Sequence, residues 1–443
     1  MVPPATRAAA FLIVASVMAG VVTAHADGPA GPDQQSRLLR TMLKHPGDYD
    51  ATFAYVRVSE GLGDYEAAIG ALERLLFYNV KLTRVKYELG TLYYRVGSYE
   101  MATSYFHQAL ASPDLDPDTR ARIEAYLPGA EKELQPVRSW FFLQTGIRYQ
   151  SNASFTPFDG MVEEGGSSYP IDFSGPHGAD WNAFALGQFA NDIDFGDQNG
   201  DKLETRVTAY ATEQFTQDSL NVGYLSATVG PRLALAPSAW SGLTVKPYLT
   251  GTAAWVGGSP YDTSAGAGVS LSMPFGKMLT VSPSVEWQHA DYPGSDPTQP
   301  LGTSDWLTAG VSASLRLNDA VSLNAAFGYR RSEAAYPWQS NNKFTEEFDL
   351  PIRFDPPSSS IGQKWTLTPF AGLSQTAFDA PNAAIDPATT RSDGMWQLGV
   401  ALDAPITAHF GVSGAVTYQR NNSNISNYSY DDWSVLGGPT VRF

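Results

Sequence analysis

The spacing of apolar residues changes abruptly in the segment from Pro136 to Trp140. Upstream of it apolar residues recur at helical spacing, and downstream they alternate with polar residues every second position as far as Phe443. A period near 3.6 indicates amphipathic helices, and a period of two indicates strands with one apolar face. One chain must therefore form two different folds, which we predict to be a helical domain at 27–135 and a strand domain at 136–443.

The first 26 residues have the pattern of a secretory signal peptide. Arg7 precedes the apolar run Ala8–Val22, and the segment Ala24–Ala26 has the small-x-small pattern of a cleavage site. An uncleaved anchor is the alternative. No later segment contains the roughly 20 consecutive apolar residues that a membrane-spanning helix needs. Any further membrane crossing is therefore expected to use strands.

The helical half repeats itself at a fixed interval. The segment Gly63–Ala68 (GDYEAA) recurs as Gly97–Ala102 (GSYEMA), 34 positions later (97 − 63 = 34). This is the period of the tetratricopeptide repeat, a pair of antiparallel helices that packs on its neighbours. A further helical stretch, Pro117 to Leu134, is expected to cap the array. We predict a short tetratricopeptide array of two repeats followed by a capping helix.

Two such repeats form a short concave groove lined by the first helix of each repeat. Arginine and aromatic side chains dominate protein-binding hot spots, so their presence on this face predicts a site for a peptide or protein client. The alternative is that these are ordinary solvated helix positions. The predicted groove residues are Arg57, Glu60, Arg84, Tyr87, Thr91, Tyr94 and Arg95.

Downstream of the change in period, fourteen segments alternate apolar and polar residues, as in Leu279–Trp287 (LTVSPSVEW). We predict a 14-stranded antiparallel transmembrane β-barrel, with a soluble β-sandwich as the alternative. An even number of strands brings both ends of the barrel to one side, and short turns are expected to alternate with longer loops. We expect short turns at 275–277 and 317–319, a tenth strand at 344–354, and long connections at 151–179, 291–303, 331–343 and 379–390.

Aromatic residues near strand ends mark the two interfaces of a membrane barrel. The terminal Phe443, in an amphipathic last strand, resembles the signal read by the barrel-assembly machinery of outer membranes. Tryptophans expected to form interfacial girdles are Trp140, Trp255, Trp287, Trp306, Trp365 and Trp433.

Charged residues of both signs occupy the face predicted to meet water inside the barrel. They either hold the lumen open or form hydrogen-bonded ladders with no role in transport. The predicted lumen residues are Arg148, Glu204, Arg206, Lys246, Glu286, Arg316, Arg330 and Arg353.

Chemistry-bearing motifs are scarce. The chain has no cysteine, its histidines lack metal-ligand spacing, and no G-x-S-x-G segment occurs. A net charge of −16 argues against a nucleic-acid partner, because phosphates need a positive field. We therefore expect no enzymatic activity, no cofactor and no metal.

Segments on both sides of the change in period resemble the surface lipoprotein assembly modulator (Slam) family. Tyr78–Gly90, with Gly97–Ala102 and Phe106, is similar to the last repeat of that family. Gly146–Ala153 (GIRYQSNA) resembles its first barrel strand, where Gly-x-x-Tyr-Asp-Ser-Asn is usual, although Gln150 replaces the aspartate. The segment Tyr418–Asn424 and the closing strand are also similar. Gln150 and the less regular first repeat put the client's identity in doubt more than the architecture.

The resemblance implies a periplasmic tetratricopeptide domain joined to a fourteen-stranded outer-membrane barrel that delivers a lipoprotein or soluble client to the cell surface. Two alternatives remain: an exopolysaccharide export porin, which generally carries many more repeats, and a passive small-solute porin. Expected partners are outer-membrane lipid, the client, the barrel-assembly machinery and periplasmic chaperones. We expect a monomer, since barrel closure leaves no free strand edge.

Overall fold

The structure, a computed structural model, describes residues 31–45, 47–171, 178–197, 199–235, 240–293, 302–358 and 361–443. The predicted signal peptide, 1–26, lies outside these residues. The chain divides into two compact units, Met1–Gln135 and Pro136–Phe443. None of the helices in the described ranges is long and apolar enough to cross a membrane.

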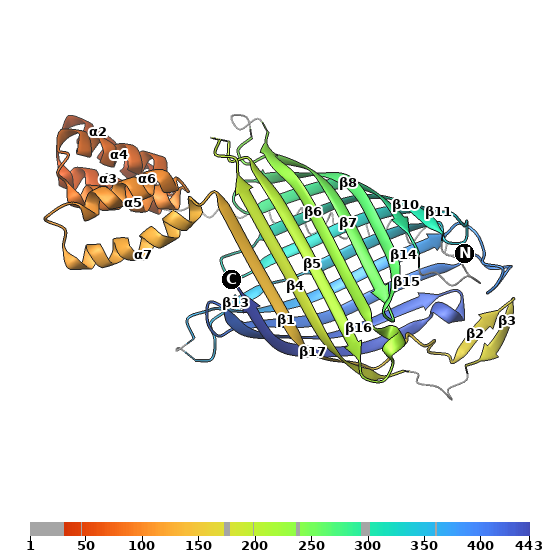
Figure 1. The fold of residues 1–443 in the computed structure, drawn as a ribbon. Coiled ribbons are helices and arrows are strands. Elements are labelled where there is room, and N and C mark those ends of the chain that lie inside the picture. Colours follow the sequence, from red (N-terminus) through yellow and green to blue (C-terminus); the bar gives the residue numbers. More distant parts are fainter. Residues whose placement is uncertain are drawn as a thin grey trace. The chain divides into compact units, whose positions relative to one another are not determined.

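The first unit is built from antiparallel helices (Figure 1). Asp48, Asp64 and Asp116 each precede a helix and accept a hydrogen bond from a backbone N–H three residues later. Such caps satisfy N–H groups that have no partner inside the helix. The described helices are α2 (Gly31–Lys44), α3 (Tyr49–Gly61), α4 (Tyr65–Tyr78), α5 (Thr83–Arg95), α6 (Tyr99–Leu110) and α7 (Pro117–Glu133).

The two repeats share their turn geometry and bury a common core. Gly63 and Gly97 follow α3 and α5 with φ of 75° and 80°, a conformation that glycine adopts without strain. Gly90 on α5 allows the Phe106 ring of α6 to approach, because a Cβ at Gly90 would lie 2.5 Å from that ring. Helix α7 packs on α6 through the fully buried Ile123, as expected of the capping helix. Helix α2 had not been predicted.

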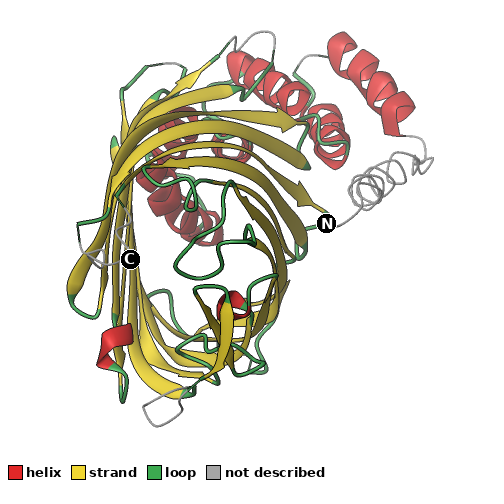
Figure 2. Cartoon of the chain, turned by 90° about the vertical axis from the view of Figure 1, so that its right-hand side faces the viewer, coloured by secondary structure: helices red, strands yellow, loops and turns green. Residues whose placement is uncertain are grey.

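The second unit is a closed antiparallel barrel. Each barrel strand pairs with the next barrel strand in the chain when β12 and β13 count as one, and β1 pairs with β17 to close the barrel (Figure 2). In the described part of the chain the barrel has fourteen strands when β12 and β13 count as one, which confirms the predicted fold class. The barrel strands are β1 (Val137–Gln150), β4 (Asp180–Asp194), β5 (Lys202–Gln214), β6 (Val222–Ala234), β7 (Thr244–Val256), β8 (Ser259–Phe275), β9 (Leu279–Asp291), β10 (Thr303–Arg316), β11 (Ser322–Ala334), β12 (Asn341–Asp349), β13 (Ile352–Phe354), β14 (Trp365–Phe378), β15 (Ser392–Pro405), β16 (Phe410–Ser423) and β17 (Tyr430–Arg442).

The barrel has its apolar side chains on the outside. Leu249 and Ile147 are 63% and 52% exposed on the outer face, whereas Asn182 and Glu204 on the inner face are 0% and 3% exposed. Alternate residues of a barrel strand face opposite sides, and an outer apolar band is the property of barrels that cross a membrane. The polar residues of the predicted alternation thus face the inside of the barrel, and the apolar residues face outward.

The two ends of the barrel carry different connections. We call the end where β1 begins the proximal end and the end where β1 finishes the distal end. Proximal turns at 276–278 and 317–321 lie where short turns were predicted. Two predictions were wrong: the link 331–343 is only 335–340, because β11 and β12 extend into it, and the tenth strand is divided at Pro351, which has no N–H to donate.

The long distal connection 151–179 contains an additional hairpin, formed by β2 (Met161–Glu164) and β3 (Ser167–Pro170). The backbone N–H groups of Gly165 and Gly166 donate to the carbonyls of Ala384 and Ile385 in the connection between β14 and β15. The Glu163 N–H donates to the side chain of Asn427 in the last connection. These bonds tie three distal connections to one another.

Candidate functional site

The predicted groove residues lie on helices α3 and α5, and two contacts join the helices across this face. An Arg95 nitrogen lies 3.7 Å from a carboxylate oxygen of Glu60. The guanidinium of Arg84 lies 4.8 Å above the Phe53 ring. Arg57 is exposed on the same helix as Glu60. The structure therefore brings four of the predicted side chains, together with Phe53, to a charged surface between α3 and α5.

The remaining groove residues turn toward the interior of the helical unit. Thr91 is buried and donates a hydrogen bond to the backbone carbonyl of Tyr87. Tyr94 packs edge to face against Tyr99 and Tyr126, each with ring centroids 5.4 Å apart. Tyr87 packs against the same apolar cluster. The sequence placed these residues on the correct helix, but helix packing uses their side chains.

Two charged residues of this face, Glu88 and Arg122, were missed by the sequence analysis. Glu88 lies 3.9 Å from Arg84 on α5. Burial raises the pKa of the Glu88 carboxyl above its ordinary value, the negative charge of Glu60 adds to the rise, and Arg84, Arg95 and Arg122 oppose it. Arg122 lies on the capping helix α7. Helices α3, α5 and α7 therefore all contribute charge to one surface.

A pocket of about 270 Å³ lies at one end of this surface. Phe53 and Val85 line it together with Lys81, Arg84 and Asp114. Asp114 accepts a hydrogen bond of 2.6 Å from the hydroxyl of the buried Thr83, which fixes one wall. The volume and the mixture of apolar and charged walls suit one side chain of a bound polypeptide.

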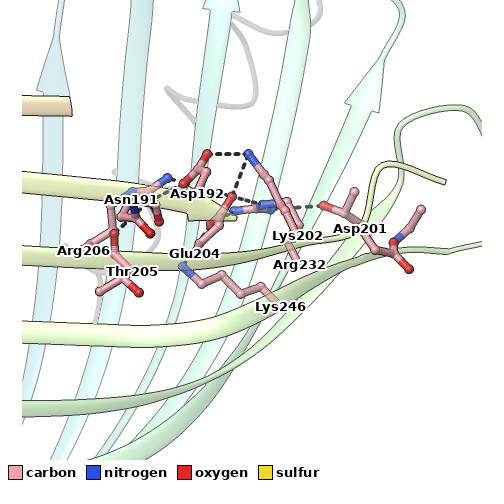
Figure 3. A network of polar contacts seen from close by, with 11 residues as sticks. Asn191, Asp192, Asp201, Lys202, Glu204, Thr205, Arg206, Arg232 and Lys246 are labelled. Atoms are coloured by element: carbon pink, nitrogen blue, oxygen red, sulfur yellow. Dashed lines mark hydrogen bonds and ion pairs between the residues drawn. The ribbon is translucent and has the colours of Figure 1, made fainter. Parts of the chain in front are cut away.

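In the barrel, three of the predicted lumen residues belong to one ion-pair network near the proximal end (Figure 3). Glu204 is bound by Arg232 through both carboxylate oxygens, at 2.7 and 3.0 Å, and by Lys246 at 3.0 Å. Lys202 joins Glu204 to Asp192, at 3.2 and 2.7 Å. Arg206 completes the network at 2.6 Å from Asp192.

The predicted lumen residues did not include Asp192, Lys202 and Arg232. They lie on β4, β5 and β6, and the strand registers Asp192↔Glu204 and Lys202↔Arg232 bring them together. The network contains four cations and two carboxylates, and each cation contacts at least one of the two carboxylates, which fits the structural alternative stated for lumen residues.

The other predicted lumen residues lie apart from this network. Glu286 accepts a hydrogen bond of 2.9 Å from the Tyr248 hydroxyl. Nε of Arg148 on β1 is buried and has no hydrogen-bond partner among the described residues. Arg316 and Arg353 lie on β10 and β13 at the proximal end, and Arg330 lies on β11 toward the distal end.

Tryptophan positions divide between the two faces of the barrel. Trp287 and Trp433 are 49% and 55% exposed on the outer face. The girdle prediction was wrong for Trp140, which shares the inner face of β1 with Gln144. It was also wrong for Trp306, which faces inward with the Arg330 guanidinium 5.1 Å above its ring. Phe443 is held by two backbone hydrogen bonds of 3.0 Å to Phe141, and its role as an assembly signal stays a prediction.

Within the described ranges, no cluster of three or more His, Cys, Asp or Glu residues could hold a metal ion.

Comparisons with known proteins return distant structural likenesses. No family model and no curated protein matches the chain. A bacterial polysaccharide outer membrane secretin is 10% identical, with 68% of this chain and 98% of that chain covered and a TM-score of 0.32. CdiB from Acinetobacter baumannii is 11% identical, with 70% and 60% covered and a TM-score of 0.35. PcrH, solved with the chaperone binding region of PopD, is 19% identical, with 23% and 78% covered and a TM-score of 0.21.

Proposed function

We propose that this protein is an outer-membrane translocator. Its helical domain captures a protein client in the periplasm, and its barrel delivers the client to the cell surface. The observation that carries this proposal is the charged surface of α3, α5 and α7, which ends in a pocket of about 270 Å³. A domain with such a surface is joined to the first barrel strand by only the residues between Glu133 and Val137.

The surface favours an extended or helical polypeptide segment as the ligand. Arg57, Arg84, Arg95 and Arg122 supply positive charge, and Glu60 and Glu88 supply negative charge. Exposed pairs of this kind contribute little to stability, on the order of 0–1 kcal/mol, so breaking them to bind a client costs little. The Phe53 pocket then accepts one apolar side chain of the client.

The resemblance to the Slam family agrees with this assignment and extends it to a lipoprotein client. The layout is the same: a short helical array precedes a fourteen-stranded barrel. The polysaccharide export porin is disfavoured, because the described helices form only two repeats and a capping helix, with α2 before them. The passive porin explains the barrel and leaves the charged surface without a role.

The test is coexpression with a candidate client, chosen as a small secreted or lipid-modified protein encoded beside this one. Protease shaving of intact cells should remove the client only when this protein is present. Equal surface exposure of the client with and without this protein would eliminate the translocator proposal.

Groove variants separate capture from barrel assembly. We expect the double variant Arg84→Glu and Arg95→Glu to reduce surface display of the client at least about tenfold, since a loss of 1.4 kcal/mol in binding is tenfold in affinity. The control is Arg37→Glu, a charge reversal at an exposed position of α2. Both proteins should keep the heat-modifiable migration of a folded barrel. Normal display by the double variant would show that this helical surface does not capture the client.

A further inference from the structure

A second cavity lies on the inner face of the barrel at the distal end. Its volume is about 380 Å³, within the range of roughly 300–1,000 Å³ that is typical of small-molecule sites. Strands β10, β11, β12, β14, β15, β16 and β17 form its walls, together with Tyr292 and Arg391. The lining residues that matter for its chemistry are Trp306, Arg330, Asn341, Lys343, Arg391 and Asp393.

The charges in this cavity are not balanced. Arg391 is paired with Asp393, at 2.7 Å, and its guanidinium lies 3.2 Å from the centre of the Tyr428 ring. Arg330 donates only to the hydroxyl of Thr308, at 3.2 Å, in the described part of the chain. Lys343 has no acidic partner within ion-pair distance among the described residues, although Glu347 and Asp393 act on it from farther away. Two cations therefore face the cavity without a carboxylate of their own.

This arrangement contrasts with the overall charge of the chain, which is −16. Cations inside a barrel wall act through a medium of low dielectric constant, and a cleft lined by one sign of charge concentrates ions of the opposite sign. The ligand that this cavity favours is an anion. Arg330 offers the planar set of donors that matches a carboxylate, and Lys343 adds a point charge.

The neutral walls indicate what else the ligand carries. Ser332 and Asn421 are 7% and 6% exposed, and both line the cavity together with the Asn341 amide. Trp306 and Tyr430 contribute aromatic rings to the same walls. Hydroxyl-rich ligands need several neutral donors and acceptors for orientation, and rings supply flat apolar contact area. Together with the two cations, these groups suit a ring-shaped polyol that bears a carboxylate.

We propose that the distal cavity binds a carboxylate-bearing saccharide, with D-glucuronate as the simplest probe. Arg330 and Lys343 bind the carboxylate, the side chains of Asn341 and Asn421 bind hydroxyl groups, and Trp306 packs on the ring. This inference goes beyond the proposed function and does not depend on it, because binding is measured on the isolated full chain without a client.

Isothermal titration calorimetry on the folded, detergent-solubilised protein tests the proposal. We expect D-glucuronate to bind at least tenfold more tightly than D-glucose, which lacks the carboxylate, and than acetate, which lacks the ring. Equal binding of glucose and glucuronate would overturn the role of the cations. Equal binding of acetate and glucuronate would overturn the saccharide and leave a simple anion site, and no binding of glucuronate would overturn the site itself.

Two substitutions locate the site. Arg330→Gln with Lys343→Gln should lower the affinity for glucuronate at least tenfold. Arg353→Gln, which removes one inward cation at the proximal end, is the matched control and should leave the affinity unchanged. Equal loss in both variants would mean that the general lumen field, and not this cavity, attracts the ligand.

Discussion

The two units of this chain bury opposite kinds of side chain. In the helical unit Leu72, Leu89 and Phe106 are fully buried and most charged residues are exposed. In the barrel Glu204 and Asn182 are buried, and Leu249 is largely exposed. Apolar surface is stable in water only when it is covered, whereas an outer apolar band is stable in lipid. The same residue types therefore form one unit that is stable in water and one that is stable in lipid, depending on the spacing at which the apolar residues recur.

The two units also differ in their clusters of charged residues. On the helical surface the arginines are exposed and their carboxylate partners are half-buried, while the proximal lumen network holds the buried Glu204 among cations. We expect the first to act in binding and the second in the structure of the barrel.

Glu204→Gln should cause the largest loss of stability. The substitution leaves Arg232, Lys246 and Lys202 without their shared carboxylate, and breaking a buried ion pair costs about 3–5 kcal/mol. The midpoint of urea unfolding in detergent measures the effect. Glu213→Gln, at an exposed position of the same strand, is the control and should be nearly neutral. If the two variants unfold at the same urea concentration, the network is not structural.

Leu249→Arg and Phe77→Arg compare two exposed apolar positions, 63% and 83% exposed. In a bilayer the first should cost about 2–4 kcal/mol, the value for arginine on the lipid face near the midplane. The second should change stability by less than about 0.5 kcal/mol, as is usual at a solvated surface. Unfolding titrations in lipid vesicles report both. A harmless Leu249→Arg would show that the outer face of the barrel does not meet lipid.

Gly90→Ala should destabilise the helical unit by about 1–3 kcal/mol, because the added methyl group overlaps the Phe106 ring. Gly70→Ala is the matched control on α4, where a Cβ meets nothing within 4 Å. It should stabilise the helix by about 0.5–1 kcal/mol. The loss of helical circular dichroism on heating measures both changes, and destabilisation by both variants would contradict the packing described for Gly90.

Glu88→Gln should give the smallest effect, and its sign depends on pH. Burial and Glu60 raise the pKa of the Glu88 carboxyl, so the folded state holds the proton more tightly than the unfolded state. The corresponding stability is present below the ordinary carboxyl pKa and is lost as pH rises through the raised value. The variant should remove this loss and be slightly more stable than the parent at neutral pH. A pH profile of stability that is unchanged by Glu88→Gln would contradict the burial of Glu88.

Much of the fold follows from local sequence pattern. The 34-residue repeat predicted the paired helices, and the alternation of residues such as Leu279–Trp287 predicted the strands and their inner and outer faces. Lys246 and Glu204 were assigned to the correct face for this reason. What period alone does not contain is the register between strands, which is set by each turn. The assembly of Asp192, Lys202 and Arg232 around Glu204 therefore could not be read from the sequence.

The direction in which a side chain points was the second feature that the sequence pattern did not predict. Tyr94 lies on a helix whose face was correctly predicted, yet its ring packs between Tyr99 and Tyr126. Trp306 was assigned to a lipid interface from its place near a strand end, although alternation along the same strand puts it on the face of Arg316, a predicted lumen residue. Alternation along this strand was the signal that could have placed Trp306 on the inner face.

The translocator proposal requires the helical unit to lie in the periplasm and the distal end of the barrel to face the outside of the cell. Because the chain has no cysteine, a single introduced thiol reports its own location without background. Glu164→Cys in the distal hairpin should react with a membrane-impermeant maleimide on intact cells. Arg40→Cys on α2 should react only after the outer membrane is permeabilised. Labelling of Arg40→Cys on intact cells, with Glu164→Cys protected, would contradict this orientation and the direction of transport proposed from it.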